Sequence, residues 1–222
     1  MNKTAVVVGG TGLIGKALVK KLCADSRYRE VKLLVRKPTA VVDSKVTVIE
    51  LDFTNIEQLK QHVVGDELFC CIGTTIRKAG SQEKFEEVDY QIPKNLAFAA
   101  AKNNVHKFLM ISSLGANSNS PNFYLRTKGK AEQALTAAGL NNYLVVRPSL
   151  LTGTREETRV GEKIGEAILS ILKPVMLGPL KKYKPVSDVL LSNALVNIAN
   201  SNFKNRVFDS PELFQWEEKH EG

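Results

Sequence analysis

The chain has 222 residues, 43% of them hydrophobic, which predicts a single domain, residues 1–222, built around one core. Three cysteines cannot form a disulfide framework, no cysteine and histidine spacing suits zinc or another metal, and no apolar run has the roughly 18 residues that would span a bilayer or the shape of a signal peptide. The formal net charge of +8 is spread along the chain without aromatic interleaving, so nucleic acid is an unlikely partner, and we predict a cytoplasmic protein.

Short apolar runs alternate with amphipathic segments through residue 150. The runs at 4–10, 31–36, 46–51, 67–73, 107–113 and 143–148 predict strands. Helices are predicted at 13–22 and 56–63, in a segment that ends with 95–104, and in a segment that contains 128–139. Apolar strands separated by helices indicate a parallel sheet that is covered on both faces. The sequence therefore predicts an α/β fold, a doubly wound parallel Rossmann sheet, with residues 1–150 as a dinucleotide-binding core.

The pattern becomes less regular after Pro148. An amphipathic helix at 160–173, a loop rich in proline and glycine at 173–185, a helix at 186–200 and a final segment at 206–214 follow. In open α/β sheets a late, irregular segment commonly covers the crevice at the carboxyl ends of the strands. We predict that residues 151–222 form a small substrate-covering segment, and that the helix at 160–173 closes over the substrate side.

The first turn reads VVVGGTGLIGKAL and joins an apolar strand to a helix. Its glycines fit two spellings of a dinucleotide-binding loop, which are Gly10, Gly12 and Gly15 or Gly9, Gly12 and Gly15. Glycine permits a tight turn and a close approach of the backbone to a pyrophosphate, whose charge meets the free N–H groups at the helix start. We predict a dinucleotide site here, and the same loop also contains Thr11, Leu13 and Ile14.

The second strand ends with Arg36 and Lys37. At this place an NAD-specific site usually has an acidic residue that binds the ribose 2′-hydroxyl. Two cations attract a 2′-phosphate instead, so the sequence favours NADP(H) as the cofactor.

The next two strand ends supply candidate contacts to the adenosine. Asp52 follows the third strand, where it can accept a hydrogen bond from the adenine amino group with Phe53 beside the ring. Gly73 follows Cys71 and Ile72 at the end of the fourth strand and lets the backbone pass close to the adenosine.

Three pairs have the spacing Tyr-x-x-x-Lys. Tyr28 with Lys32 lies at the amino end of the second strand, away from the cofactor edge of the sheet. Tyr90 with Lys94 flanks Pro93, which is typical of the first turn of a helix, so this pair is interpreted as structural.

The third pair is placed differently. Tyr124 and Lys128 follow the fifth strand, and at positions i and i+4 they share one face of a helix. Ser113 ends the fifth strand and reaches the same crevice. The sequence therefore favours this pair as the one that faces a cofactor.

The segments GGTGLIG, ISS and YLRTK, in this order, resemble the short-chain dehydrogenase/reductase superfamily in its atypical NAD(P)-binding branch. The runs FCCIGTTIRKAGSQEKFEEVDY and KFLMISSLGANSNSPNFYLRTKGKAE are similar, more narrowly, to the group of the Tat-interacting-protein oxidoreductase and its bacterial relatives. The resemblance implies a catalytic triad, with further cofactor contacts from the segment that follows it: Ser113, Tyr124 and Lys128 for the triad, and Pro148, Leu151 and Arg159 for the contacts. Ser113 is closer to the tyrosine than in classical members, so Ser112 remains an alternative.

These side chains fit the reduction of a carbonyl group. The ammonium group of Lys128 favours the phenolate of Tyr124 and can hold the ribose hydroxyls, Ser113 can donate to the carbonyl oxygen, and Tyr124 can supply the proton. The sequence predicts an NADPH-dependent short-chain dehydrogenase/reductase that acts, as a monomer or homodimer, on a small, rather apolar carbonyl or alcohol substrate. The alternative is an NADPH-binding redox sensor or scaffold without turnover.

Overall fold

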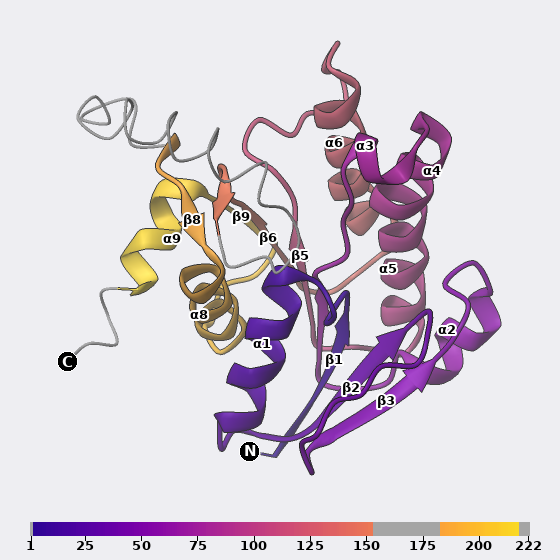
Figure 1. Cartoon of the computed structure of the whole chain (residues 1–222), viewed down its shortest axis with the longest axis vertical. Coiled ribbons are helices and arrows are strands. Elements are labelled where there is room, and N and C mark those ends of the chain that lie inside the picture. Colours follow the sequence, from indigo (N-terminus) through magenta and orange to yellow (C-terminus); the bar gives the residue numbers. More distant parts are fainter. Residues whose placement is uncertain (1, 153–182, 218–222) are drawn as a thin grey trace.

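Seven parallel strands form the central sheet, in the order β3-β2-β1-β4-β5-β6-β9 (Figure 1). The computed structural model describes residues 2–152 and 183–217. The strands of the sheet are β1 (Lys3–Val8), β2 (Tyr28–Val35), β3 (Val46–Glu50), β4 (Glu67–Cys70), β5 (Lys107–Ile111), β6 (Tyr143–Arg147) and β9 (Arg206–Asp209). The order reverses between β1 and β4, which confirms the predicted doubly wound Rossmann-like sheet.

Helices join the strands and cover both faces of the sheet. They are α1 (Leu13–Ala24), α2 (Ile56–His62), α3 (Ile76–Ala79), α4 (Gln82–Glu86), the π-helical turn η1 (Glu87–Gln91), α5 (Ile92–Lys102), α6 (Phe123–Ala137), α8 (Asp188–Ala199) and α9 (Ser210–Glu217). A separate two-stranded ladder pairs β7 (Leu151–Thr152) with β8 (Val186–Ser187).

The side chains of β1 show how one strand serves two cores. Ala5 and Val7 pack into the apolar cluster that lies under α1 and α8, whereas Val6 and Val8 pack into the cluster under α2, α5 and α6. Alternate residues of a strand point to opposite faces, so a continuous apolar run is what a sheet covered on both faces requires.

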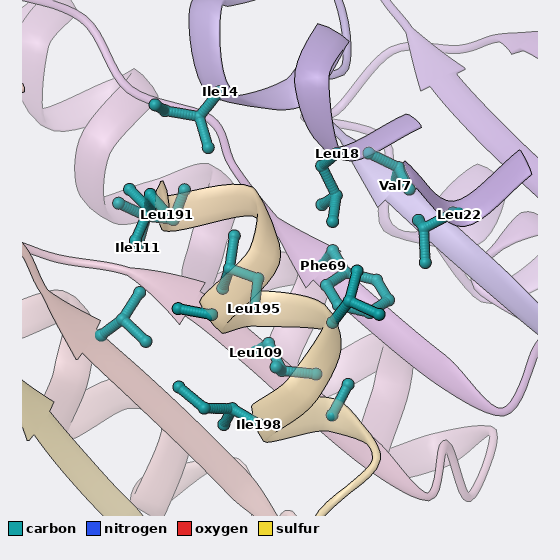
Figure 2. Close-up of a cluster of buried hydrophobic side chains, with 14 of the residues drawn as sticks. Val7, Ile14, Leu18, Leu22, Phe69, Leu109, Ile111, Leu191, Leu195 and Ile198 are labelled. Carbon is teal, nitrogen blue, oxygen red and sulfur yellow. The ribbon is translucent and has the colours of Figure 1, made fainter. Parts of the chain in front are cut away.

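Figure 2 shows the first of these clusters, in which α8 lies against α1 over the middle of the sheet. Leu191 and Leu195 of α8 and Leu18 of α1 are buried there with the ring of Phe69 from β4. Burying large apolar side chains of this kind is the main stabilising contribution to such a layer.

Part of the region predicted to cover the substrate also completes the sheet and its helical layer. Strand β9 extends the sheet beside β6, and α8 packs against α1. The physical reason is that α8 is apolar around most of its circumference, which is typical of a buried helix: its buried residues are Leu190, Leu191, Ser192, Ala194, Leu195, Val196, Ile198 and Ala199. The helix predicted at 160–173, and the loop after it up to residue 182, lie outside the described residues.

Candidate active site

The candidate site lies where the strand order reverses. The loop after β1, residues 9–12, and the loop after β4, residues 71–75, meet at the carboxyl ends of these two neighbouring strands. Both loops line a cavity of about 930 Å³ that reaches α6. This crevice is where open α/β sheets bind their ligands.

The glycine loop is shaped by close backbone contacts. Gly9 has a φ of +83°, and a Cβ atom there would lie 2.6 Å from the backbone carbon of Cys71. A Cβ atom on Gly15 would lie 2.2 Å from the carbonyl oxygen of Gly9, so the loop tolerates no side chain at either place. The spelling that begins at Gly9 is therefore the one that the backbone requires.

The start of α1 is open to an anion. Gly12 is its N-cap residue and forms no side-chain cap within the described structure, and the first turn carries no acidic residue. The free N–H groups and the positive end of the helix macrodipole favour a phosphate group at this place. The residues present thus fit the pyrophosphate of a dinucleotide.

An ion pair lies in the wall of the cavity. Lys128 Nζ of α6 lies 2.6 Å from Asp89 Oδ1 of η1, and the two side chains are 8% and 0% exposed. Burial lowers the pKa of Lys128, but the interaction with Asp89, and to a smaller extent that with Tyr124, outweighs it, so the pKa lies above its usual value. The lysine is therefore a buried cation in the cavity wall.

Tyr124 lies one helical turn before Lys128 and lines the same cavity. Its ring packs against the buried ring of Phe85 from α4, with 5.7 Å between the ring centroids. Asn122 caps the helix just before it by accepting a hydrogen bond from the backbone N–H of Leu125. The helix start and this aromatic contact fix the position of the phenol.

The two candidate serines have different partners. Ser112 is buried, and its hydroxyl donates a hydrogen bond of 2.5 Å to Glu132, which is also held by two hydrogen bonds from Arg147. Ser113 is half-buried, and its hydroxyl lies 3.5 Å from the carbonyl oxygen of Leu114. Of the two serine hydroxyls, only that of Ser112 donates a hydrogen bond to a carboxylate.

A second cavity, of about 390 Å³, adjoins the first and shares with it Ile72, Gly73, Thr74 and Lys78. Arg36 lines this second cavity, together with Lys78 and Lys84. Three cations from three elements therefore surround a space at the end of β2.

The larger cavity brings together most of the residues predicted from the sequence: Thr11, Gly12, Leu13, Ile14, Cys71, Ile72, Gly73, Tyr124, Lys128 and Leu151. Neither cavity is lined by seven others, which are Gly9, Gly15, Lys37, Asp52, Phe53, Ser113 and Pro148. Phe53 is 3% exposed, and its ring belongs to the core under α2 instead of facing the cavity. Arg159 lies outside the described residues.

The other two tyrosine pairs lie elsewhere. Tyr28 is buried at the start of β2, where its hydroxyl donates a 2.6 Å hydrogen bond to Glu67. Tyr90 packs against the core under α5, with the ammonium group of Lys94 5.8 Å from its ring centroid. Neither tyrosine lines the two cavities.

The sequence prediction omitted Asp89 and Glu132. A signal for Asp89 was present, because Phe85, Asp89, Ile92 and Leu96 recur at helical spacing and the other three are apolar. An acidic residue on the buried face of a helix needs a partner, which here is the lysine of α6. No comparable sequence pattern indicated that Glu132 would contact a site residue.

The described ranges contain no group of three or more residues suited to hold a metal ion. Nor does any helix within these ranges have the length and apolar character needed to cross a membrane.

The fold, the glycine loop and the open start of α1 define a dinucleotide-binding protein of the Rossmann class. The family model described as NAD(P)H-binding matches residues 9–168. The chain belongs to this NAD(P)H-binding, oxidoreductase-like family, and the resemblance predicted from the sequence is confirmed.

Three known proteins illustrate the similarity. Protein FMP52, mitochondrial, of Candida albicans is 32% identical over 189 residues, which cover 82% of this chain and 82% of that protein. Protein HTATIP2 of Rattus norvegicus is 30% identical over 165 residues, which cover 72% and 71% of the two chains. The structure of UDP-glucuronic acid 4-epimerase from Bacillus cereus in complex with NAD has a TM-score of 0.67 at 15% identity, covering 92% of this chain and 76% of that one, and supports the fold alone.

The predicted cytoplasmic location is corrected by this comparison. Several fungal relatives, including those of Candida albicans and Debaryomyces hansenii, are named as mitochondrial proteins. The prediction rested on the lack of a signal peptide and of a long apolar run, and neither feature separates the cytoplasm from other compartments that lie behind a membrane.

Proposed function

We propose that the protein is an NADPH-dependent reductase of a small, rather apolar carbonyl compound. The observation that carries the proposal is that the glycine loop, Tyr124 and Lys128 line one cavity. Ile14, Ile111 and Leu151 contribute apolar side chains to the same cavity, which supports a substrate with little charge.

The proposed reaction uses three side chains in distinct roles. The dinucleotide, when bound, supplies the hydride that adds to the carbonyl carbon. Tyr124 gives its phenolic proton to the carbonyl oxygen as the new C–H bond forms, so the product is an alcohol, and the phenolate regains a proton from solvent. Ser113 donates a hydrogen bond to the same oxygen while negative charge develops on it.

Lys128 has two roles in the proposed site. Its charge favours the phenolate form of Tyr124 after proton transfer, and its ammonium group is a donor for the hydroxyls of the cofactor ribose. Ser112 lines the cavity and Ser113 does not, but the hydroxyl proton of Ser112 is engaged by Glu132. Ser113 is therefore proposed as the donor, with Ser112 as the alternative.

The first test is direct. NADPH is added to the purified protein with a panel of small aldehydes and ketones, and its oxidation is followed by absorbance. Turnover of at least one carbonyl compound is expected. Tight NADPH binding without turnover of any of them would favour the redox sensor.

NADP(H) is proposed as the preferred cofactor because Arg36, Lys78 and Lys84 line the cavity at the end of β2. A 2′-phosphate adds about two negative charges at the ribose, and a guanidinium group binds phosphate oxygens in a bidentate way.

Replacing Arg36 by Asp is therefore expected to weaken binding of NADPH and to leave binding of NADH equal or tighter. The dissociation constants of both dinucleotides can be measured by fluorescence titration. Arg29→Asp is the matched control, because Arg29 is exposed at the opposite end of the same strand and the change in net charge is identical. Equal affinities for NADPH and NADH in the parent protein would contradict the preference.

A further inference from the structure

Asp89 has no part in the reaction proposed above, yet its side chain is completely buried beside the site. One carboxylate oxygen lies 2.6 Å from Lys128 Nζ, and the other accepts a 2.9 Å hydrogen bond from the backbone N–H of Thr74. Burying a carboxylate is costly unless it is paired and hydrogen-bonded, and both partners of Asp89 belong to the site: Lys128 lines the cavity and Thr74 lies in the loop after β4. A role for this group beyond packing is therefore worth testing.

We propose that Asp89 is a positioning residue of this site, which holds Lys128 charged and directed into the cofactor cavity and at the same time fixes the loop after β4. This inference rests on the proposed reductase function. It assigns the residue no contact with the substrate, and its effect passes through Lys128 and through the backbone of Thr74.

The charge state of Lys128 depends on few groups. The described residues that face it with titratable side chains are Asp89 of η1, Tyr124 of α6 and Cys70 of β4. Burial raises the pKa of the Cys70 thiol to about 12, so this group is neutral. Asp89, which lies 2.6 Å from Lys128 Nζ, makes the largest contribution that opposes the effect of burial on the lysine.

The same carboxylate orders the loop that both cavities share. A Cβ atom on Gly73 would lie 3.4 Å from Asp89 Oδ1 and 3.6 Å from Lys128 Nζ, so the loop backbone packs directly over the ion pair. The backbone N–H of Thr74, in the same loop, donates a hydrogen bond to the other carboxylate oxygen of Asp89. Movement of Asp89 would therefore disturb the lysine and the cofactor loop together.

An exposed ion pair between the same two parts of the chain supplies a matched control. Lys130 Nζ of α6 lies 3.3 Å from Glu86 Oε1 of α4, with the two side chains 42% and 37% exposed. Water solvates both of these groups, so losing the carboxylate has little consequence for Lys130. The comparison separates the effect of a buried carboxylate from that of any carboxylate in this region.

The test measures the ionisation of Lys128 by NMR of protein labelled in its lysine side chains, with Lys128→Met used to assign the signal. In the parent, the titration midpoint of Lys128 is expected to lie above the usual value for a lysine, because Asp89 favours the charged form. In Asp89→Asn the amide oxygen can still accept from Thr74 but the charge is lost, so the titration midpoint is expected to fall by roughly one to three pH units. Asp89→Glu restores the charge and is expected to restore the midpoint, and Glu86→Gln is expected to leave it unchanged.

Turnover provides a second readout. The alkaline limb of the pH profile for NADPH oxidation is expected to move down in Asp89→Asn by the same shift as the lysine midpoint, and the KM for NADPH is expected to rise. An unchanged Lys128 midpoint in Asp89→Asn would overturn the inference. The titration needs no substrate, so failure to find a carbonyl substrate would count against the reductase and not against the ion pair.

Discussion

Replacing Tyr124 by Phe is expected to lower turnover by roughly 10²- to 10⁴-fold, which is the usual cost of removing a general acid. The variant keeps the ring that packs against Phe85, so the fold is expected to be unaffected. The affinity for NADPH is expected to stay near that of the parent, because the glycine loop and the start of α1 bind the dinucleotide without this hydroxyl. Steady-state kinetics and a fluorescence titration with NADPH measure the two effects separately.

Tyr90→Phe is the control for this experiment. Tyr90 also begins a Tyr-x-x-x-Lys pair, but its ring packs in the core under α5 and does not line either cavity. Its turnover is expected to equal that of the parent. If Tyr124→Phe kept full activity, the assignment of the proton donor would be wrong, whatever the substrate.

Most of the fold was predictable because the elements through residue 150 carry regular periodicity. The apolar run AVVV in β1, which is followed directly by glycines, is typical of a strand with two covered faces, and the order of strands and helices then leaves few topologies. The packing of α8 against α1 was not predicted, because α8 follows an irregular segment and was assigned with it to the substrate-covering region. Its apolar residues on almost every side, from Leu190 to Ala199, were the overlooked sign that it belongs to a buried layer.

The site was predictable at the level of strand ends and not at the level of side-chain partners. Tyr124 and Lys128 could be placed together because they share a helix face, whereas the contact between Lys128 and Asp89 joins two elements that are distant in sequence. The spacing alone did not distinguish Ser112 from Ser113, and in the structure Ser112 lines the cavity whereas Ser113 does not. The hydroxyl of Ser112 also donates to Glu132 of α6, and no spacing rule contains that information.

A second buried carboxylate lies at the other end of the sheet, far from the candidate site. Glu67, at the start of β4, is 2% exposed. It accepts a 2.6 Å hydrogen bond from the hydroxyl of Tyr28 and forms a 2.6 Å ion pair with Lys3. Asn200, which follows α8, donates to the same tyrosine hydroxyl and accepts from Lys3. One carboxylate therefore ties together the starts of β1, β2 and β4 and the end of α8.

Glu67→Ala is expected to lower the free energy of unfolding by roughly 2 to 4 kcal/mol, somewhat less than for a fully buried pair because Lys3 retains access to water. The loss has two causes: the hydroxyl of Tyr28 is left without its acceptor, and Lys3 is left without its counterion. Urea denaturation followed by circular dichroism measures the change, and NADPH saturation of the folded fraction is expected to be normal.

Glu57→Ala is the matched control, because Glu57 forms an ion pair of 2.8 Å with Lys60 on the exposed surface of α2. Solvent screens that pair, so its loss is expected to change stability by no more than about 1 kcal/mol. If Glu67→Ala were equally mild, the cluster around Tyr28 would not be a stabilising junction. The first Tyr-x-x-x-Lys pair would then lack the structural explanation that its buried hydrogen bond to Glu67 otherwise provides.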